Sequence, residues 1–171
     1  MIQVVAAQAV HRAALEAHHA AVRVTTGFTK RNVALLFEAD TLLMKLTAEF
    51  LSLFGVESSA NSLLIPKGGK HIRSRHRHDT AEILSGLLPA LTNIKYVQER
   101  RNRTGKMEYG VIGEHRPGRM LFVAIKFVPA RSAASGEDEA LVPTAYIINL
   151  REVDRLLYQG QLRQVFPVRL S

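Results

Sequence analysis

The feature that most limits the fold is a change in the spacing of apolar residues near Ile94. Before this point apolar side chains recur every third or fourth residue, and after it many of them alternate with polar ones. Alternation is typical of strands with one buried face. The apolar segments that predict strands begin at Ile94, Met107, Leu121 and Leu141, with turns at 102–105 and 116–118. Because the first turns are short, we expect a four-stranded antiparallel meander, followed by a helix over 150–158.

The chain before this sheet is predicted to be helical. Residues 2–24 are rich in alanine and lack glycine and proline, and residues 29–54 carry leucine and phenylalanine at spacings of three and four. Gly55 is suited to end the second helix. Residues 1–56 are therefore predicted to form a helical hairpin extension, and the polar residues 57–62 a linker.

The second predicted domain spans residues 62–171. A short strand over 63–65 precedes a helix that starts at the capping box formed by Asp79 and Glu82 and ends or kinks at Pro89. This helix is expected to pack on the sheet. The predicted fold class is α+β: an N-terminal helical hairpin, then a small domain with a helix on a four-stranded antiparallel sheet.

The positive charge of the chain is concentrated in one segment. Of the net charge of +8, residues 67–131 contribute fourteen Lys and Arg against five Asp and Glu. A local basic surface is typical of a polyanion partner, and we expect RNA. The chain has no cysteine, which fits a reducing compartment such as the cytoplasm, and no apolar run long enough for an integral membrane segment.

Residues 70–78 concentrate the side chains that could carry chemistry, behind the glycines 68 and 69. Imidazole transfers protons near neutral pH, and guanidinium binds phosphate. Cleavage of RNA by its own 2′-hydroxyl requires a base, an acid and cations that stabilise charge on phosphorus. The segment therefore predicts RNA cleavage without a metal. Its candidate residues are Lys70, His71, Arg73, Arg75, His76, Arg77 and His78.

Two geometries of this segment remain open. In a helix, His71, Arg75 and His78 share one face; in a turn, His76 could join the site. The three histidines also resemble a zinc-binding tract, but the neighbouring cations would repel a dication, so no metal and no cofactor are predicted. A nucleotide-binding loop is not predicted either, because the Gly-Lys-Ser/Thr sequence is missing.

Further candidates lie on the predicted sheet. Thr144 and Tyr146 are two residues apart on the last strand, so their side chains project from one face. Arginines and a lysine gather at two hairpin tips, where they would contact the RNA backbone. These substrate-binding candidates are Arg100, Arg101, Arg103 and Lys106 at the first tip, and Arg119, beside Arg116, at the second.

The order of these motifs resembles a known superfamily over residues 62–150. A strand, then His71-Ile72-x-x-Arg75-His76, a short helix near a proline and a meander ending in Thr144-x-Tyr146 is similar to the barnase/EndoU/colicin/RelE-like (BECR) nucleases. The nearest likeness is to their phage and polymorphic-toxin branch.

The resemblance implies a metal-independent endoribonuclease, a hydrolase acting as a toxin on transfer or messenger RNA and leaving a 2′,3′-cyclic phosphate. His71 and His76 would be the acid and base, Arg75 would hold the phosphate, and Thr144 and Tyr146 would complete the site. Such a toxin would act in the cytoplasm, after delivery from another cell or by a phage. An acidic immunity protein or antitoxin would neutralise it.

Two other interpretations stay open. The same basic surface would suit a module that binds RNA or a ribosome without cutting it. The chain could also be a phage accessory protein whose nuclease-like fold has lost its chemistry.

Overall fold

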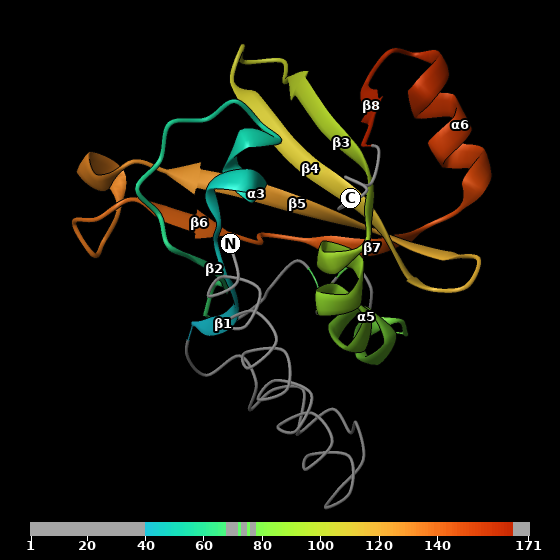
Figure 1. Ribbon diagram of the computed structural model, residues 1–171, viewed down its shortest axis with the longest axis horizontal. Helices are drawn as coiled ribbons and strands as arrows, with labels where there is room; N and C mark the ends of the chain where they lie inside the picture. The colour runs from blue at the N-terminus through green and yellow to red at the C-terminus, as the bar shows by residue number, and fades with distance from the viewer. Residues whose placement is uncertain (1–39, 68–71, 73–74, 76–77, 166–171) are drawn as a thin grey trace, which may run out of the picture.

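The computed structural model describes residues 40–67, 72, 75 and 78–165 (Figure 1). In this part of the chain, eight strands form one mixed sheet, accompanied by three α-helices and one 3-10 turn. The elements are β1 (Thr41–Lys45), α3 (Ala48–Ser52), β2 (Ser62–Ile65), α5 (Thr80–Thr92), β3 (Ile94–Arg101), β4 (Met107–Arg116), β5 (Arg119–Val128), η1 (Ala130–Ser132), β6 (Glu139–Leu141), β7 (Ala145–Ile148), α6 (Leu150–Tyr158) and β8 (Leu162–Gln164).

The sheet is larger than the predicted one. Its order is β1-β2-β6-β5-β4-β3-β8, with β7 pairing with β5 next to the β6 segment. All pairings are antiparallel except that of β2 with β6. The prediction of a four-stranded antiparallel sheet was therefore wrong, because it left out strands whose partners are far away in the sequence.

The predicted N-terminal helical hairpin is also wrong where the structure describes it. Residues 41–45, inside the predicted second helix, form β1 and pair with β2. Only the five residues of α3 are helical there. The apolar run at 42–44 fits a helix or a buried strand equally well, and pairing with β2 decides between them. The predicted helix over 2–24 lies outside the described residues.

The central strands match their predictions closely. β3, β4 and β5 form an antiparallel meander whose turns contain Gly105 and Gly118, both at positive φ. The predicted fourth strand is divided into β6 and β7 around Pro143, which has no N–H to donate to a ladder. The helix α6 covers the predicted residues, whereas α5 continues through Pro89 to Thr92.

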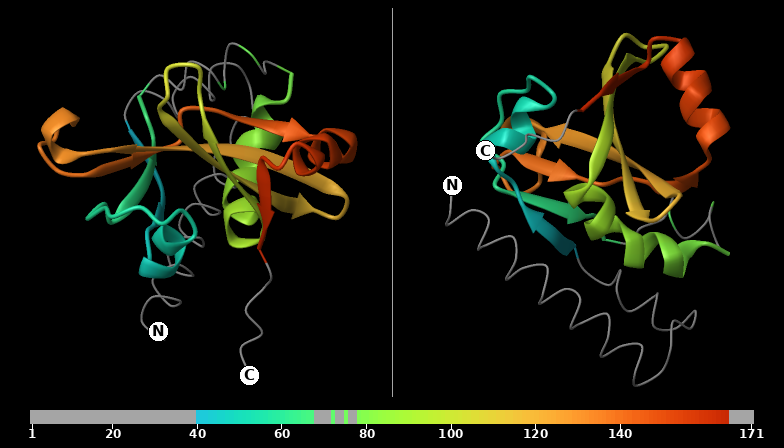
Figure 2. Two further views of the ribbon diagram at one scale, coloured as in Figure 1. Left: turned by 90° about the horizontal axis from the view of Figure 1, so that it is seen from above. Right: turned by 45° about the vertical axis from the view of Figure 1, so that its right-hand side comes forward.

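Two apolar clusters lie on opposite faces of the meander. Neighbouring residues alternate between them: Val111 and Leu121 belong to the main core with α5, and Ile112 and Phe122 to a smaller cluster under α6. The strands β4 and β5 pass between the two helices (Figure 2).

The main core joins segments from both predicted domains. Phe50 of α3 and Leu43 of β1 pack in one cluster with Leu63 and Leu87. The predicted linker is hydrogen-bonded to two other segments. The carbonyl of Asn61 accepts from the N–H of Leu46, and the N–H of Ser59 donates to the carboxylate of Asp138. No helix within the described residues has both the length and the apolar character that crossing a bilayer requires.

Candidate nucleic-acid interface

Most of the histidine–arginine cluster lies outside the described residues: Lys70, His71, Arg73, His76 and Arg77. The described members of the segment are Ile72, Arg75 and His78. Ile72 is fully buried in the main core, whereas Arg75 and His78 are exposed. Ile72 therefore fixes its point of the segment to the face of the sheet that carries α5.

The described residues on the two sides of the cluster contact segments next to β7. Upstream, β2 runs parallel to β6, and the N–H of Val142 donates to the carbonyl of Leu64 at 2.8 Å. The end of β2 is thus level with the residues that lead into β7. Downstream, Glu82 of α5 binds the β4–β5 hairpin, where Met120 pairs with Ile148 at the end of β7.

Glu82 is the centre of the ionic network at this hairpin. Its carboxylate accepts hydrogen bonds from Arg116 Nη2 at 2.7 Å, from Arg119 Nε and Nη2 at 3.1 and 2.9 Å, and from His115 Nε2 at 3.1 Å. Partial burial works to raise the pKa of Glu82, but these hydrogen bonds and charges lower it below its ordinary value. Arg119, a predicted substrate-binding residue, is therefore bound to a carboxylate of the protein.

His115 was not predicted. Its side chain is only 4% exposed and its ring lies against Gly86 of α5, where an added Cβ would come within 2.8 Å of the ring. Nδ1 is buried without a hydrogen-bond partner among the described residues. The neutral tautomer with the proton on Nε2 leaves only an acceptor unpaired, and it can donate to Glu82. A glycine inside an otherwise apolar helix is the one sequence signal for such a close neighbour.

Tyr146 lies on the opposite face of the sheet, at the edge of the cluster under α6. Its ring stacks on Phe122, with centroids 4.9 Å apart and planes at 29°. The Phe122 ring in turn occupies the space over Gly110, where an added Cβ would lie 2.6 Å from it. Thr144 is two residues before Tyr146, and its carbonyl accepts from the N–H of Ala124 at 3.0 Å. Thr144 lies just before β7, and Ala124, to which its carbonyl is hydrogen-bonded, packs against the cluster under α6.

Charged side chains from two elements influence the Tyr146 phenol electrostatically. Burial raises the pKa of Tyr146 above 10.0, as does the charge of Glu152, while Arg100 of β3 and Arg155 of α6 oppose this shift. The phenol therefore keeps its proton at neutral pH and can donate it in a hydrogen bond. Arg100 was a predicted substrate-binding residue, whereas Arg155 was not, because its position next to Tyr146 depends on how α6 folds back over the sheet.

Glu152 and Arg155 form a bidentate ion pair on α6. Arg155 Nε donates to Glu152 Oε2 at 2.9 Å, and Nη2 donates to Oε1. Hydrogen bonding to Arg155 lowers the pKa of Glu152, so this carboxylate is ionised at neutral pH. Asn149 caps the helix by accepting from the N–H of Glu152 at 2.8 Å, which fixes the pair at the first turn of α6.

The β3–β4 hairpin carries the other predicted cations. Arg100 is paired with Glu108 at 2.8 Å, and Arg101 Nη1 donates to the carbonyl of Gly105 at 3.1 Å. Arg103 and Lys106 are exposed at the tip.

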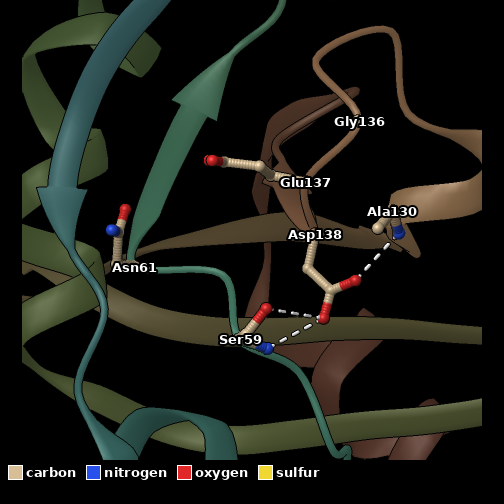
Figure 3. A pocket seen from close by; sticks show the side chains of 6 residues that line it. All are labelled: Ser59, Asn61, Ala130, Gly136, Glu137 and Asp138. Atoms are coloured by element: carbon tan, nitrogen blue, oxygen red, sulfur yellow. Dashed lines mark hydrogen bonds between the residues drawn. The ribbon is translucent and has the colours of Figure 1, made fainter.

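One hollow of about 410 Å³ lies away from these residues, between the residues before β2 and the β5–β6 loop (Figure 3). Asp138 is bound on its wall by the N–H of Ser59 and the N–H of Ala130, each at 2.8 Å. These backbone hydrogen bonds lower the pKa of Asp138. Both carboxylate oxygens of Asp138 are thus used to hold the β5–β6 loop. None of the predicted site residues lines the hollow.

Among the described residues, no three His, Asp or Glu side chains gather as a metal site would require. This statement does not cover His71 and His76, which lie outside the described residues. Comparisons of the chain with protein-family models, with curated proteins and with solved structures found no match.

Proposed function

We propose that the protein is a metal-independent endoribonuclease that cleaves RNA by attack of the 2′-hydroxyl and leaves a 2′,3′-cyclic phosphate. The observation that carries the proposal is the environment of the Tyr146 side chain. A half-buried phenol that keeps its proton lies on a sheet face with Arg100 and Arg155 close enough to influence it electrostatically. Ile72 of the histidine–arginine cluster packs on the opposite face of the sheet, so the proposal requires the cluster to reach Tyr146 around the edge of β7, which pairs only with β5 among the described strands.

Each group has a definite part in this reaction. The histidines of the cluster would remove the proton from the 2′-hydroxyl and protonate the departing 5′-oxygen. Arg75 would stabilise the negative charge that gathers on the phosphorane. Tyr146, with Thr144 beside it, would donate a hydrogen bond to a non-bridging oxygen. Phe122 keeps the Tyr146 ring in place by stacking.

The test is RNA cleavage by the full chain in excess chelator. Total RNA is incubated with the wild type and with His71→Ala, His76→Ala and Tyr146→Phe variants, and the ends of the products are analysed. We expect cleavage that persists in chelator, gives cyclic phosphate ends and falls by about 100-fold or more in the histidine variants. Tyr158→Phe is the matched control, since that tyrosine is 94% exposed on the outside of α6.

The alternative results separate the other functions. Intact RNA together with salt-sensitive binding would mean that the protein is an RNA-binding module and not a nuclease. Loss of cleavage on chelation would mean a metal-dependent reaction. Wild-type cleavage by both histidine variants would remove the cluster from the mechanism.

The proposal extends to biological context as a toxin acting on cytoplasmic transfer or messenger RNA. A cell that makes an active ribonuclease has to neutralise it, and a basic site favours an acidic immunity protein or antitoxin. Recovery of an acidic partner on a pull-down from the native host would support this role. A pull-down that recovers no acidic protein would count against it.

A further inference from the structure

We infer that the tip of the β3–β4 hairpin is a docking site for the RNA backbone, and that the β4–β5 hairpin is not. This inference rests on the proposed function, because it takes the ligand to be RNA. The sequence gives both hairpins arginines and does not distinguish between them, whereas the structure does.

The β3–β4 tip keeps positive charge that no carboxylate compensates within the described residues. Its two acidic residues are already used: Glu108 pairs with Arg100 at 2.8 Å, and Glu99 lies 3.8 Å from Arg163 of β8. Within the part of the chain that the structure describes, no ion pair involves the remaining cations of the tip, which are Arg101, Arg103 and Lys106.

The tip is also rigid before any ligand arrives. Asn102 Oδ1 accepts from the N–H of Thr104 and the N–H of Lys106, both at 3.0 Å, and from the Thr104 hydroxyl at 2.7 Å. The N–H of Asn102 donates to the Lys106 carbonyl at 2.8 Å, and Gly105 takes the positive φ of +80° that the turn needs. A turn held this way presents its cations without an ordering cost in the backbone.

The β4–β5 hairpin differs in the use of its arginines. Arg116 and Arg119 both bind Glu82, and Arg119 does so through two nitrogens. To bind a phosphate, these arginines would have to give up hydrogen bonds to a carboxylate, so their net gain would be small. Their role is to hold α5 against the sheet.

An RNA strand that reaches both sites would follow a track whose two ends are Tyr146 and the β3–β4 tip. Tyr146 pairs with Phe122, which pairs with Ile112 of β4. From Ile112 to Met107, beside the tip, is five residues along β4, or about 17 Å at ~3.4 Å per residue, and the two strand spacings between β7 and β4 add about 10 Å across the sheet. The total of roughly 20 Å corresponds to about six nucleotides at ~3.4 Å per phosphate along one strand. Arg100, whose charge influences Tyr146, is paired with Glu108 at 2.8 Å, so it does not add a free cation between the two ends.

The experiment measures binding apart from cleavage. A fluorescent 12-nucleotide 2′-O-methyl oligoribonucleotide, which has no free 2′-hydroxyl to attack, is titrated with the full chain from 0.05 to 0.3 M salt. We expect the Arg103→Gln/Lys106→Gln variant to lower the slope of log K against log salt by about 1.4, since each lost phosphate contact removes ~0.7 on a single strand. At 0.1 M salt this corresponds to binding weaker by about 25-fold, if the contacts contribute nothing at 1 M.

The matched control is Arg131→Gln/Arg151→Gln, which removes the same charge from two exposed arginines outside the track. Arg116→Gln serves as the control for the second hairpin. Both should bind within about twofold of wild type, and all variants should keep the wild-type circular dichroism spectrum.

If the two double variants weakened oligonucleotide binding equally, the loss would follow from net charge alone, and the inference would be overturned. Unchanged binding by Arg103→Gln/Lys106→Gln would overturn it as well. Binding to an acidic protein but not to RNA through this tip would replace it with a protein-docking surface. If the oligonucleotide binds as expected while natural RNA stays uncut, the nuclease proposal fails and the docking site stands.

Discussion

A single methyl group at Gly113 should separate α5 from the sheet. The structure places the carbonyl of Ala90 so close to β4 that a Cβ at position 113 would lie 1.9 Å from its oxygen and 2.6 Å from its carbon. Backbone atoms cannot rotate away as a side chain can. To reach the 3.4 Å of an ordinary contact, the helix would have to withdraw by about 1.5 Å.

Such a withdrawal would open the main core, because α5 contributes the fully buried Ile83 and Leu87 to it. Overpacking of a core usually costs about 1–3 kcal/mol. The contact here is backbone on backbone, so we expect Gly113→Ala to lower the free energy of unfolding by at least about 3 kcal/mol. Against a total of ~5–15 kcal/mol, this is a large fraction of the stability.

The assay is urea unfolding followed by circular dichroism, with Gly110→Ala as the comparison. A Cβ at position 110 would meet the Phe122 ring at 2.6 Å, and a side chain can shift. We expect Gly110→Ala to cost about 1–2 kcal/mol and to disturb the stacking of Tyr146. If Gly113→Ala were as stable as the wild type within about 0.5 kcal/mol, the described packing of α5 on β4 would be refuted.

Three further predictions concern ionisable groups. Glu82→Gln should destabilise the protein by about 2 kcal/mol above pH 4.5, the ordinary pKa of the carboxyl. Because the pKa of Glu82 is lower in the folded state, the difference in unfolding free energy between wild type and variant should shrink as the pH falls from 4.5 through the folded pKa. Urea titrations at several pH values measure this difference. A difference that stays constant with pH would contradict the ionic network around Glu82. In an absorbance titration at 295 nm, the phenol ionisation that disappears in Tyr146→Phe should lie above pH 10, the ordinary pKa of tyrosine; a midpoint at or below pH 10 would be the contrary result. Asp138→Asn should lower the melting temperature near pH 7 and lose this effect in acid, since the folded pKa of Asp138 is depressed; an unchanged melting temperature would contradict the role given to Ser59 and Ala130.

The parts of the fold that sequence patterns predicted depend on local information. The β3–β4–β5 meander follows from alternation and from turns that require a positive φ at Gly105 and Gly118. The strand β1 was missed because Leu42, Leu43, Leu46 and Phe50 satisfy a helical spacing as well as a buried strand. Its pairing with β2, about twenty residues later, is a non-local contact that periodicity does not record.

In the candidate site, too, local patterns predict some features and non-local contacts decide the others. The common face of Thr144 and Tyr146 stays a prediction from alternation. Arg155 reaches Tyr146 only because α6 folds back over the sheet, and Arg119 is bound by a carboxylate 37 residues away in the sequence. Charge counts place cations at hairpin tips, but they do not show which of them are already paired.

The most direct test of the account is the dependence of cleavage on the 2′-hydroxyl. The wild-type chain is incubated in excess chelator with one RNA oligonucleotide that it cuts, and with the same oligonucleotide carrying a single 2′-deoxy residue on the 5′ side of the mapped cleavage site. We predict cleavage of the first with a cyclic phosphate end, and an intact bond at that site in the second. Cleavage of both at the same bond would contradict attack by the 2′-hydroxyl, and with it the proposed mechanism.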